Sequence, residues 1–275
     1  MNKKYSLFGM PAQVEFCSKC VISNQKPNSA IEFKLKNTNK KEGIRIDKKI
    51  CSACEYNVIK NNIDWKKREK DLIKLLDKYR KNSGYDVVVP GSGGKDSAFT
   101  AHILKYKYGM NPLTVTWAPH KYTDIGWKNF TNWIHIGGLD NFLFTPNGKL
   151  HRKLTGLAFK NLLHPFQPFI IGQKLIAPKI AAKFNIPLIM YGENQAEYGN
   201  DINDNYKPKM DEKFYSIKHT KEISLGGVSL QKLLKNEEFK LNDYESYIPF
   251  GLNELKKNKI EFHYLGYYLK WDPQE

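Results

Sequence analysis

The chain has 275 residues, with 44 Lys or Arg against 28 Asp or Glu, and a formal net charge of +16. This length suggests one large domain with a smaller attachment. Because no apolar stretch approaches membrane-spanning length and none resembles a secretory signal, we expect a cytoplasmic protein without a membrane partner. The first 84 residues contain 20 basic and 9 acidic side chains. This excess indicates either a solvated lysine-rich surface or attraction of polyanions such as RNA or a nucleotide-linked substrate.

Residues 1–60 form a basic module that contains every cysteine of the chain, in two pairs: Cys17 with Cys20, and Cys51 with Cys54. Two closely spaced pairs of thiolates are what a tetrahedral structural zinc site requires. A disulfide framework is disfavoured in the cytosol, while an iron–sulfur cluster remains an alternative for four cysteines. The segment between the pairs has room for a hairpin, with short strands expected at 31–35 and 43–46.

Residues 61–84 are expected to form a linking helix, because apolar residues recur at helical spacing over 64–79. Residues 85–275 then alternate between β-branched runs and amphipathic segments. This alternation predicts an α/β fold, a parallel doubly wound sheet with helices on both faces. The expected strands are 85–90, 112–117, 141–145 and 186–191, and the expected helices are 97–108, 124–135 and 169–184, the last interrupted by Pro178. The lysine- and asparagine-rich span 199–243 is expected to be a long, partly mobile insertion.

The most informative motif is Ser92-Gly93-Gly94-Lys95-Asp96-Ser97, placed between the first strand and its helix. Glycines and hydroxyl side chains at a helix N-terminus make an anion-binding site, since backbone N–H groups and the positive end of the helix dipole face the ligand. The motif is not a Walker loop, which needs Gly-Lys-Ser/Thr after four intervening residues. It resembles the SGGxDS signature of the PP-loop ATP pyrophosphatases, which transfer AMP from ATP to an oxygen atom and release pyrophosphate.

That resemblance implies that the loop holds the pyrophosphate of ATP. Ser92, Gly93, Gly94, Lys95, Asp96 and Ser97 are then the ATP-binding residues, joined by Trp117 at the end of the second strand, where the adenine would lie. Asp96 carries the wrong charge for direct phosphate contact, which suggests Mg²⁺ between them. Lys95 is expected to offset phosphate charge. Glu193, after the fourth strand, is a candidate second Mg²⁺ ligand or transition-state stabiliser, with Asn194 and Glu197 expected beside it.

The order of motifs along the chain narrows the resemblance further. A four-cysteine module is followed by SGGKDS, HRKLT (151–155), PFIIGQ (168–173), GENQAEYG (192–199) and GYYLKWDP (266–273). This order resembles the N-acetyl sugar amidotransferases of surface-polysaccharide and nonulosonic acid biosynthesis. Members of that family extend further, so we expect this chain to be shortened at its C-terminus.

The family resemblance implies an ATP-dependent amidotransferase. The amide oxygen of an N-acetylated sugar or nucleotide sugar would be adenylated, and ammonia would then displace AMP to leave an acetamidino group. Ammonia would come from separate glutaminase and cyclase-like subunits. The alternative is a PP-loop enzyme that thiolates tRNA, but such enzymes generally need a further cysteine pair near ATP, and no cysteine follows Cys54. A third possibility is a non-catalytic assembly subunit that docks partners through its zinc module.

Overall fold

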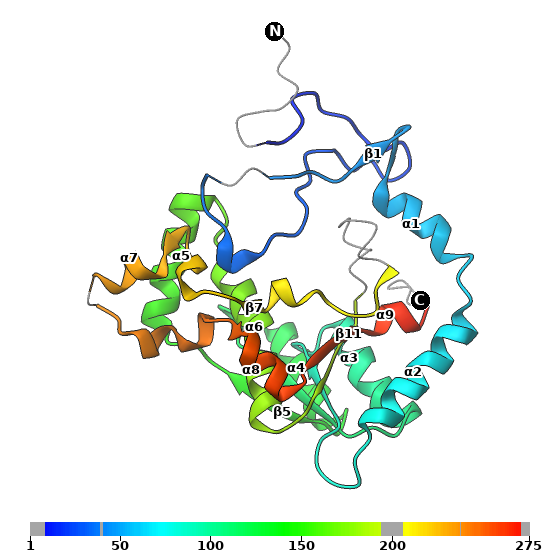
Figure 1. Ribbon diagram of the computed structural model, residues 1–275. Coiled ribbons are helices and arrows are strands. Elements are labelled where there is room, and N and C mark those ends of the chain that lie inside the picture. Colours follow the sequence, from blue (N-terminus) through cyan, green and yellow to red (C-terminus); the bar gives the residue numbers. More distant parts are fainter. Residues whose placement is uncertain (1–8, 39–40, 194–205, 237, 271–275) are drawn as a thin grey trace.

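A computed structural model of the chain describes residues 9–38, 41–193, 206–236 and 238–270 (Figure 1). Its centre is a five-stranded parallel sheet with the order β11-β6-β3-β4-β5. The strands are β3 (Val87–Pro90), β4 (Pro112–Trp117), β5 (Asp140–Phe144), β6 (Leu188–Tyr191) and β11 (Glu261–Tyr264). The predicted α/β fold is therefore confirmed, and each of the four predicted strands is present. The strand order reverses beside β3, and such a switch point opens a ligand crevice at the carboxyl ends of the strands.

Helices cover both faces of this sheet, because its central strands are apolar on both sides. Val87 and Val89 pack on one face, while Val88 packs on the other. The first face is covered by α2 (Trp65–Tyr79), α3 (Lys95–His102), η2 (Ile103–Lys107), α4 (Asp124–His135) and α9 (Leu265–Tyr268). The second face is covered by α5 (Gly148–Leu162) and α6 (Gln167–Lys183).

The span expected to be a mobile insertion is instead part of the main core over its described residues. Segments 206–236 and 238–243 contribute buried apolar side chains to the second face, including Phe214, Leu225 and Leu233. Their charged residues lie between these apolar positions, so the average composition hid the buried ones. Between β6 and β11, the described residues form η5 (Glu212–Phe214), β7 (Ser216–Ile217), η6 (Thr220–Glu222), β8 (Ser224–Leu225), β9 (Val228–Ser229), α7 (Leu230–Leu234), η7 (Leu241–Tyr247), β10 (Phe250–Gly251) and α8 (Leu252–Asn258).

The N-terminal module stands apart from the sheet and meets the main body along two paths (Figure 1). It contains η1 (Glu32–Lys34), β1 (Ile46–Asp47), β2 (Ile50–Cys51) and α1 (Ser52–Lys60). The prediction of a hairpin with strands at 31–35 and 43–46 is wrong. The hairpin is formed by β1 and β2, around Lys48 and Lys49, which both have positive φ as in a type I′ turn.

Segment 27–35, which we call the N-terminal arm, packs on the main body instead of forming a strand. Phe33 is 1% exposed and belongs to the core of the second sheet face. The side-chain amide of Gln167 donates to the carbonyl oxygen of Glu32 at 2.7 Å. Lys34 pairs with Glu222 at 2.6 Å. The arm is therefore fixed to α6 and its neighbours by a buried ring and by polar contacts.

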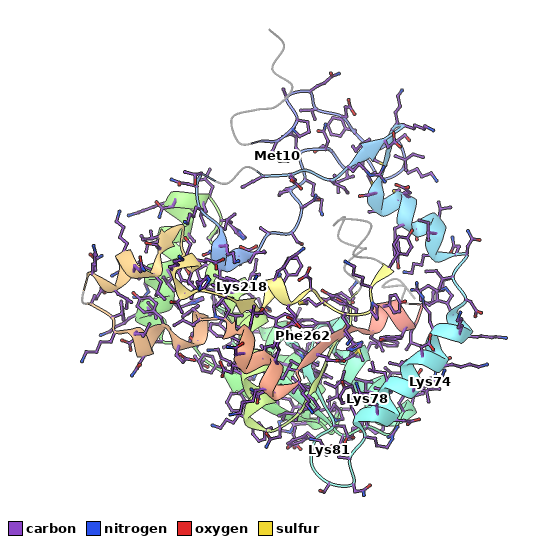
Figure 2. All side chains as sticks on the ribbon, viewed as in Figure 1. Met10, Lys74, Lys78, Lys81, Lys218 and Phe262 are labelled. Carbon is purple, nitrogen blue, oxygen red and sulfur yellow. The ribbon has the colours of Figure 1, made fainter. Side chains whose placement is uncertain are left out.

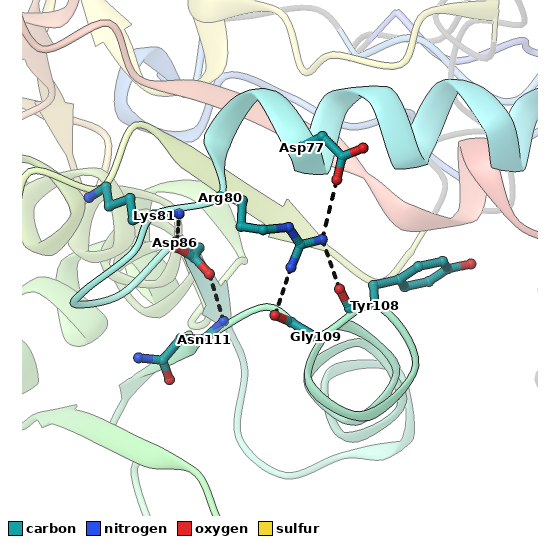
Figure 3. Close-up of polar contacts among 7 residues, drawn as sticks. All are labelled: Asp77, Arg80, Lys81, Asp86, Tyr108, Gly109 and Asn111. Atoms are coloured by element: carbon teal, nitrogen blue, oxygen red, sulfur yellow. Dashed lines mark hydrogen bonds and ion pairs between the residues drawn. The ribbon is translucent and has the colours of Figure 1, made fainter.

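The predicted linking helix corresponds to α2 (Figure 3). Hydrogen bonds join its C-terminal end to the segments that lead into β3 and β4. The guanidinium of Arg80 donates to the carbonyl oxygens of Gly109 at 2.7 Å and Tyr108 at 2.9 Å. The buried carboxylate of Asp86 accepts the backbone N–H groups of Lys81 and Asn111. These contacts fix the start of β3, the strand that leads into the SGGKDS loop.

Part of the basic excess lies on this helix. Lys81, which follows the helix, lies at the outside of the molecule (Figure 2). Lys74 and Lys78 are four residues apart on α2, also at the outside and away from the central Phe262. Residues at this spacing share a helix face. Lys78 donates to the hydroxyl of Tyr79, and Lys81 donates to the carbonyl oxygen of Asn185. Within the described ranges, no helix is both long and apolar enough to cross a membrane.

Candidate functional site

The SGGKDS loop joins β3 to α3 through a turn that only glycine can form. Gly93 has φ +78°, and a Cβ there would meet the backbone of Asn129 and Phe130 at 3.0 Å. A Cβ on Gly91 would lie 2.1 Å from that of Ser97. The glycines therefore let the loop pass tightly between α4 and the first turn of its own helix. The predicted strand–loop–helix arrangement is present.

A cavity of about 360 Å³ opens at this loop, and we call it the loop cavity. Ser92, Gly94, Asp96 and Ser97 line it from one side. Glu193, directly after β6, lines it from another side, so the structure brings the two predicted carboxylates to one space. Asn194 and Glu197 lie outside the described residues. A cavity at the carboxyl ends of β3, β4 and β6 is where ligands of open α/β sheets bind.

Two of the predicted ATP-binding residues take other places. Gly93 packs against α4 and is not among the described residues that line the loop cavity. Lys95 is exposed at the first position of α3, and it too is absent from the lining. Their predicted contacts with ATP stay predictions.

Trp117 lines the loop cavity from the end of β4, but it is a core residue over most of its surface. It is 3% exposed, and its ring stacks on Phe144 at 5.1 Å between ring centres. Its opposite contact is Gly172 of α6, where a Cβ would lie 2.3 Å from the indole ring. This close approach explains the glycine of the PFIIGQ segment. The buried indole nitrogen of Trp117 has no hydrogen-bond partner among the described residues.

Lys174, a half-buried lysine of α6, lines the same cavity and was not predicted from the sequence. Burial lowers the pKa of Lys174, while the charges of Glu32 and Glu193 act in the opposite direction. Its ammonium also lies 5.1 Å from the ring centre of Phe214. Lys174 directly follows the PFIIGQ segment and lies one turn after Ile170, between the apolar residues of the first half of α6 and Leu175. This position was the signal that the sequence offered.

These features fit a nucleoside triphosphate. A Cβ on Gly94 would find its nearest neighbour, the hydroxyl of Ser92, only at 3.9 Å, so the loop leaves room at the helix start for a phosphate. Gly94 is the N-cap of α3 and provides no side-chain cap, which suits an anion at that position. Asp96 and Glu193 are oxygen donors of the kind Mg²⁺ prefers. Lys174 adds a cation beside them.

The four cysteines form one cluster, as expected for a metal site. All four Sγ atoms lie within 4.8 Å of one another. The Cys17–Cys54 and Cys20–Cys51 Sγ distances are 3.9 and 3.6 Å. Thiolates about 2.3 Å from one tetrahedral ion lie about 3.8 Å apart, so a single zinc ion fits this cluster. Separate thiolates around several iron atoms would have to be farther apart.

The backbone of the cluster favours a thiolate at Cys17, whereas burial raises the pKa of the Cys51 and Cys54 thiols. Cys17 accepts the N–H groups of Cys51 at 3.3 Å and Lys19 at 3.4 Å, and the N–H of Cys54 points to Cys51 Sγ at 3.4 Å. Hydrogen bonds from the backbone of Cys20 and Cys51 lower the pKa of Cys17 to about 6. Ile44 is buried beside Cys17 and Cys51 in a small core of its own. The site therefore has the closed form of a structural metal centre.

The histidines showed no metal-ligand spacing in the sequence, but two of them meet in the structure. His151, in the HRKLT segment of α5, is buried and lies 3.0 Å from His120, Nε2 to Nε2. Its Nδ1 lies 2.7 Å from the hydroxyl of Tyr247. Burial, followed by the neighbouring His120, lowers the pKa of His151 to about 4. This pair lies beside Trp117, whose ring centre is 6.1 Å from that of His151.

No protein-family model matches the chain, and no curated protein matches it. Among solved structures it is similar to an NH3-dependent NAD synthetase from Campylobacter jejuni, with 18% identity, a TM-score of 0.35, and coverage of 48% of this chain and 58% of that one. It is also similar to a predicted subunit of tRNA methyltransferase from Methanocaldococcus jannaschii, with 16% identity, a TM-score of 0.34, and coverage of 70% and 71%. An NMN synthetase from Francisella tularensis has 12% identity, a TM-score of 0.36, and coverage of 78% and 100%. These similarities are low, and the fold described above stands on the sheet and loop themselves.

Proposed function

We propose that this protein is an ATP-dependent amidotransferase that converts the N-acetyl group of a sugar into an acetamidino group. The observation that carries the proposal is the loop cavity, where the SGGKDS turn, two carboxylates and a half-buried lysine meet at the carboxyl ends of the strands. This arrangement suits transfer of AMP with release of pyrophosphate.

The chemistry has two steps. The amide oxygen of the acetamido group attacks the α-phosphorus of ATP, the bond to the β-phosphate oxygen breaks, and pyrophosphate leaves. Ammonia then adds to the activated carbon, and AMP leaves with the former amide oxygen. A proton lost from the added nitrogen passes to solvent, and the amidine remains. Adenylation is needed because an amide oxygen is otherwise a very poor leaving group.

The residues of the loop cavity divide this work. Ser92, Gly94 and Ser97 hold the pyrophosphate at the start of α3. Asp96 and Glu193 would hold Mg²⁺, which would neutralise charge on the phosphates when bound. Lys174 offsets the negative charge that grows on the phosphorus centre in the transition state. Trp117 forms the apolar floor beside the adenine.

The cysteine positions favour this function over tRNA thiolation. Every cysteine of the chain is in the cluster of the N-terminal module, and none lines the loop cavity. A sulfur-transfer route through cysteine at ATP is therefore not offered by this chain. If all four cysteines bind zinc, no thiol is left to act as a glutaminase nucleophile. Ammonia would come from a separate glutaminase and cyclase-like pair.

The test is a product assay. The purified protein is incubated with Mg-ATP, ammonium chloride and a panel of N-acetylated sugars and nucleotide sugars, and the products are measured by mass spectrometry. The expected result is AMP and pyrophosphate in equal amounts, together with a sugar in which NH replaces one oxygen. Sulfur incorporation into tRNA, without any change in a sugar, would contradict the proposal and establish the thiolation alternative. Asp96→Asn serves as the inactive control.

A further inference from the structure

A second cavity lies directly beside the loop cavity. It has a volume of about 710 Å³ and is formed by the N-terminal arm and the turn between α5 and α6. Ser29 and Ile170 line both cavities. Ile170 and Lys174 are one turn apart on α6, so a single face of that helix leads from one cavity to the other. We propose that this second space, the arm cavity, binds the acceptor as an uncharged N-acetylhexosamine ring.

The wall of the arm cavity is preformed. Gln167 is fully buried at the first turn of α6 and reaches two partners with one amide. Its nitrogen donates to Glu32 of the arm, and its oxygen accepts the N–H of Gly226 at 2.9 Å. With Phe33 buried in the main core, the arm has little freedom to move away from α6. Small-molecule sites are usually formed before the ligand arrives.

Two side chains that line the arm cavity, Asn28 and Glu32, each have a buried acceptor atom without a donor among the described residues. The side chain of Glu32 is 11% exposed, and its Oε2 has no hydrogen-bond partner among the described residues. His164 Nε2 lies 3.4 Å from that oxygen, within ion-pair distance but outside hydrogen-bond geometry. Asn28 Oδ1 is likewise buried without a partner among the residues described. Buried acceptors without donors are costly. Each of the two atoms exposes less than 1 Å², so a small shift of these side chains toward the arm cavity would let sugar hydroxyls and the acetamido N–H donate to them.

The rest of the lining distinguishes a sugar from a phosphate chain. Ile31, Leu35 and Leu163 give apolar surface, which suits the C–H faces of a pyranose ring and the acetyl methyl group. Lys34 is held by Glu222, so its charge is offset where it borders the cavity. Lys41 and Glu42 also line the cavity, so its two lysines are matched in number by two carboxylates. This balance of charge favours an uncharged polyol over a nucleic-acid backbone. The volume is also far larger than ammonia requires, so an ammonia channel alone does not account for it.

The position of Glu32 links the two cavities. Its carboxylate acts electrostatically on Lys174, which lines the loop cavity. A ring bound to Glu32 would therefore have its acetamido group directed past Ser29 and Ile170 toward the α-phosphate. This part of the assignment rests on the proposed function, because only an adenylating enzyme requires the amide oxygen to reach ATP.

Binding is tested without ATP, so that the result does not depend on turnover. The methyl glycosides of N-acetylglucosamine, N-acetylgalactosamine and N-acetylmannosamine are titrated into the full chain by ligand-observed NMR. The tested variants are Glu32→Gln and Leu163→Asn, the latter at a left-handed position that Asn tolerates. Glu55→Gln and Leu241→Asn are matched controls outside the cavity. We expect at least about tenfold weaker binding for Glu32→Gln, a smaller loss for Leu163→Asn, and no change in the controls.

Hydrogen exchange supplies the second readout. The bound sugar should protect backbone amides in 27–35 and 163–170 of the wild-type chain. Failure of all three glycosides to bind, or equal binding by Glu32→Gln and wild type, would overturn the assignment. Failure of the proposed function looks different: the sugar binds the arm cavity, yet no AMP forms when Mg-ATP and ammonium are added. Turnover with an unchanged KM for the sugar in both variants would leave the function standing and reject the arm cavity.

Discussion

Gly192 and Asp96 are in contact although they lie on different crossovers: a Cβ on Gly192 would sit 2.6 Å from the carbonyl oxygen of Asp96. The same Cβ would lie 2.6 Å from the hydroxyl of Thr100, which donates to that carbonyl at 2.7 Å. The end of β6 therefore packs directly on the first turn of α3. This contact sets Glu193 opposite the SGGKDS loop and makes the two carboxylates part of one site.

Replacing Gly192 with Ala is accordingly expected to separate these two elements. The added methyl must push α3 away from β6, which costs about 1–3 kcal/mol of unfolding free energy and displaces the phosphate-binding turn. We expect ATP affinity, measured by isothermal titration calorimetry, to fall at least about tenfold. Gly156→Ala is the control, because a Cβ there meets nothing within 4 Å and Ala favours the helix. Normal ATP affinity in Gly192→Ala would show that the contact does not position the loop.

Lys174 offers a test of the transition-state role within the loop cavity. Lys174→Gln removes the positive charge but keeps a polar side chain of similar length. We expect the rate of pyrophosphate release to fall by about a hundredfold, with a smaller change in ATP affinity, since the charge acts mainly on the developing negative charge. Lys183→Gln, at the exposed end of the same helix, should have no effect. Equal rates for Lys174→Gln and wild type would remove Lys174 from the mechanism.

The metal centre predicts a measurable stoichiometry. Elemental analysis of protein purified without added metal should find one zinc per chain and no iron, because the four Sγ atoms are close enough for a single ion. Cys20→Ser should lose the zinc and lower the melting temperature, since the small core around Ile44 depends on the metal. Ser18→Ala, in the same knuckle, should retain both. Iron with inorganic sulfide in the purified protein would refute the zinc assignment.

The sequence predicted the main architecture because its signals were local. The β-branched run before Ser92 and the helical spacing of 124–135 each depend on a few neighbouring residues, and the structure has a strand and a helix there. The sequence did not reveal which residues of distant segments contact one another. Phe33 reads as part of a polar, irregular module, yet it is buried in the core of the main body through contacts with residues far along the chain.

The candidate site was predicted in part for the same reason. Asp96 is placed by its own loop, and Glu193 follows a recognisable strand. Lys174 and Glu32 reach the two cavities only through tertiary packing of α6 against the arm, for which no local pattern exists. His120 follows β4 and His151 lies on α5, so their contact likewise depends on tertiary packing.

That histidine pair gives a prediction about stability and pH. The pKa of His151 is lowered to about 4 from its ordinary value of 6.5 by burial and by His120. Between these two values the unfolded chain binds a proton that the folded chain refuses, so the unfolding free energy should fall as the pH is lowered from 6.5 to 4. The loss is about 3 kcal/mol at most, and it should level off below pH 4, where both states are protonated.

Urea denaturation across this range would measure the effect. In His151→Gln, whose amide can still bond to the hydroxyl of Tyr247, the decline from pH 6.5 to 4 should be shallower than in wild type. His135→Gln, at the exposed end of α4, should retain the wild-type slope. If the slopes of His151→Gln and wild type coincide, His151 takes up its proton equally in both states, and the acid sensitivity of the fold must come from other groups.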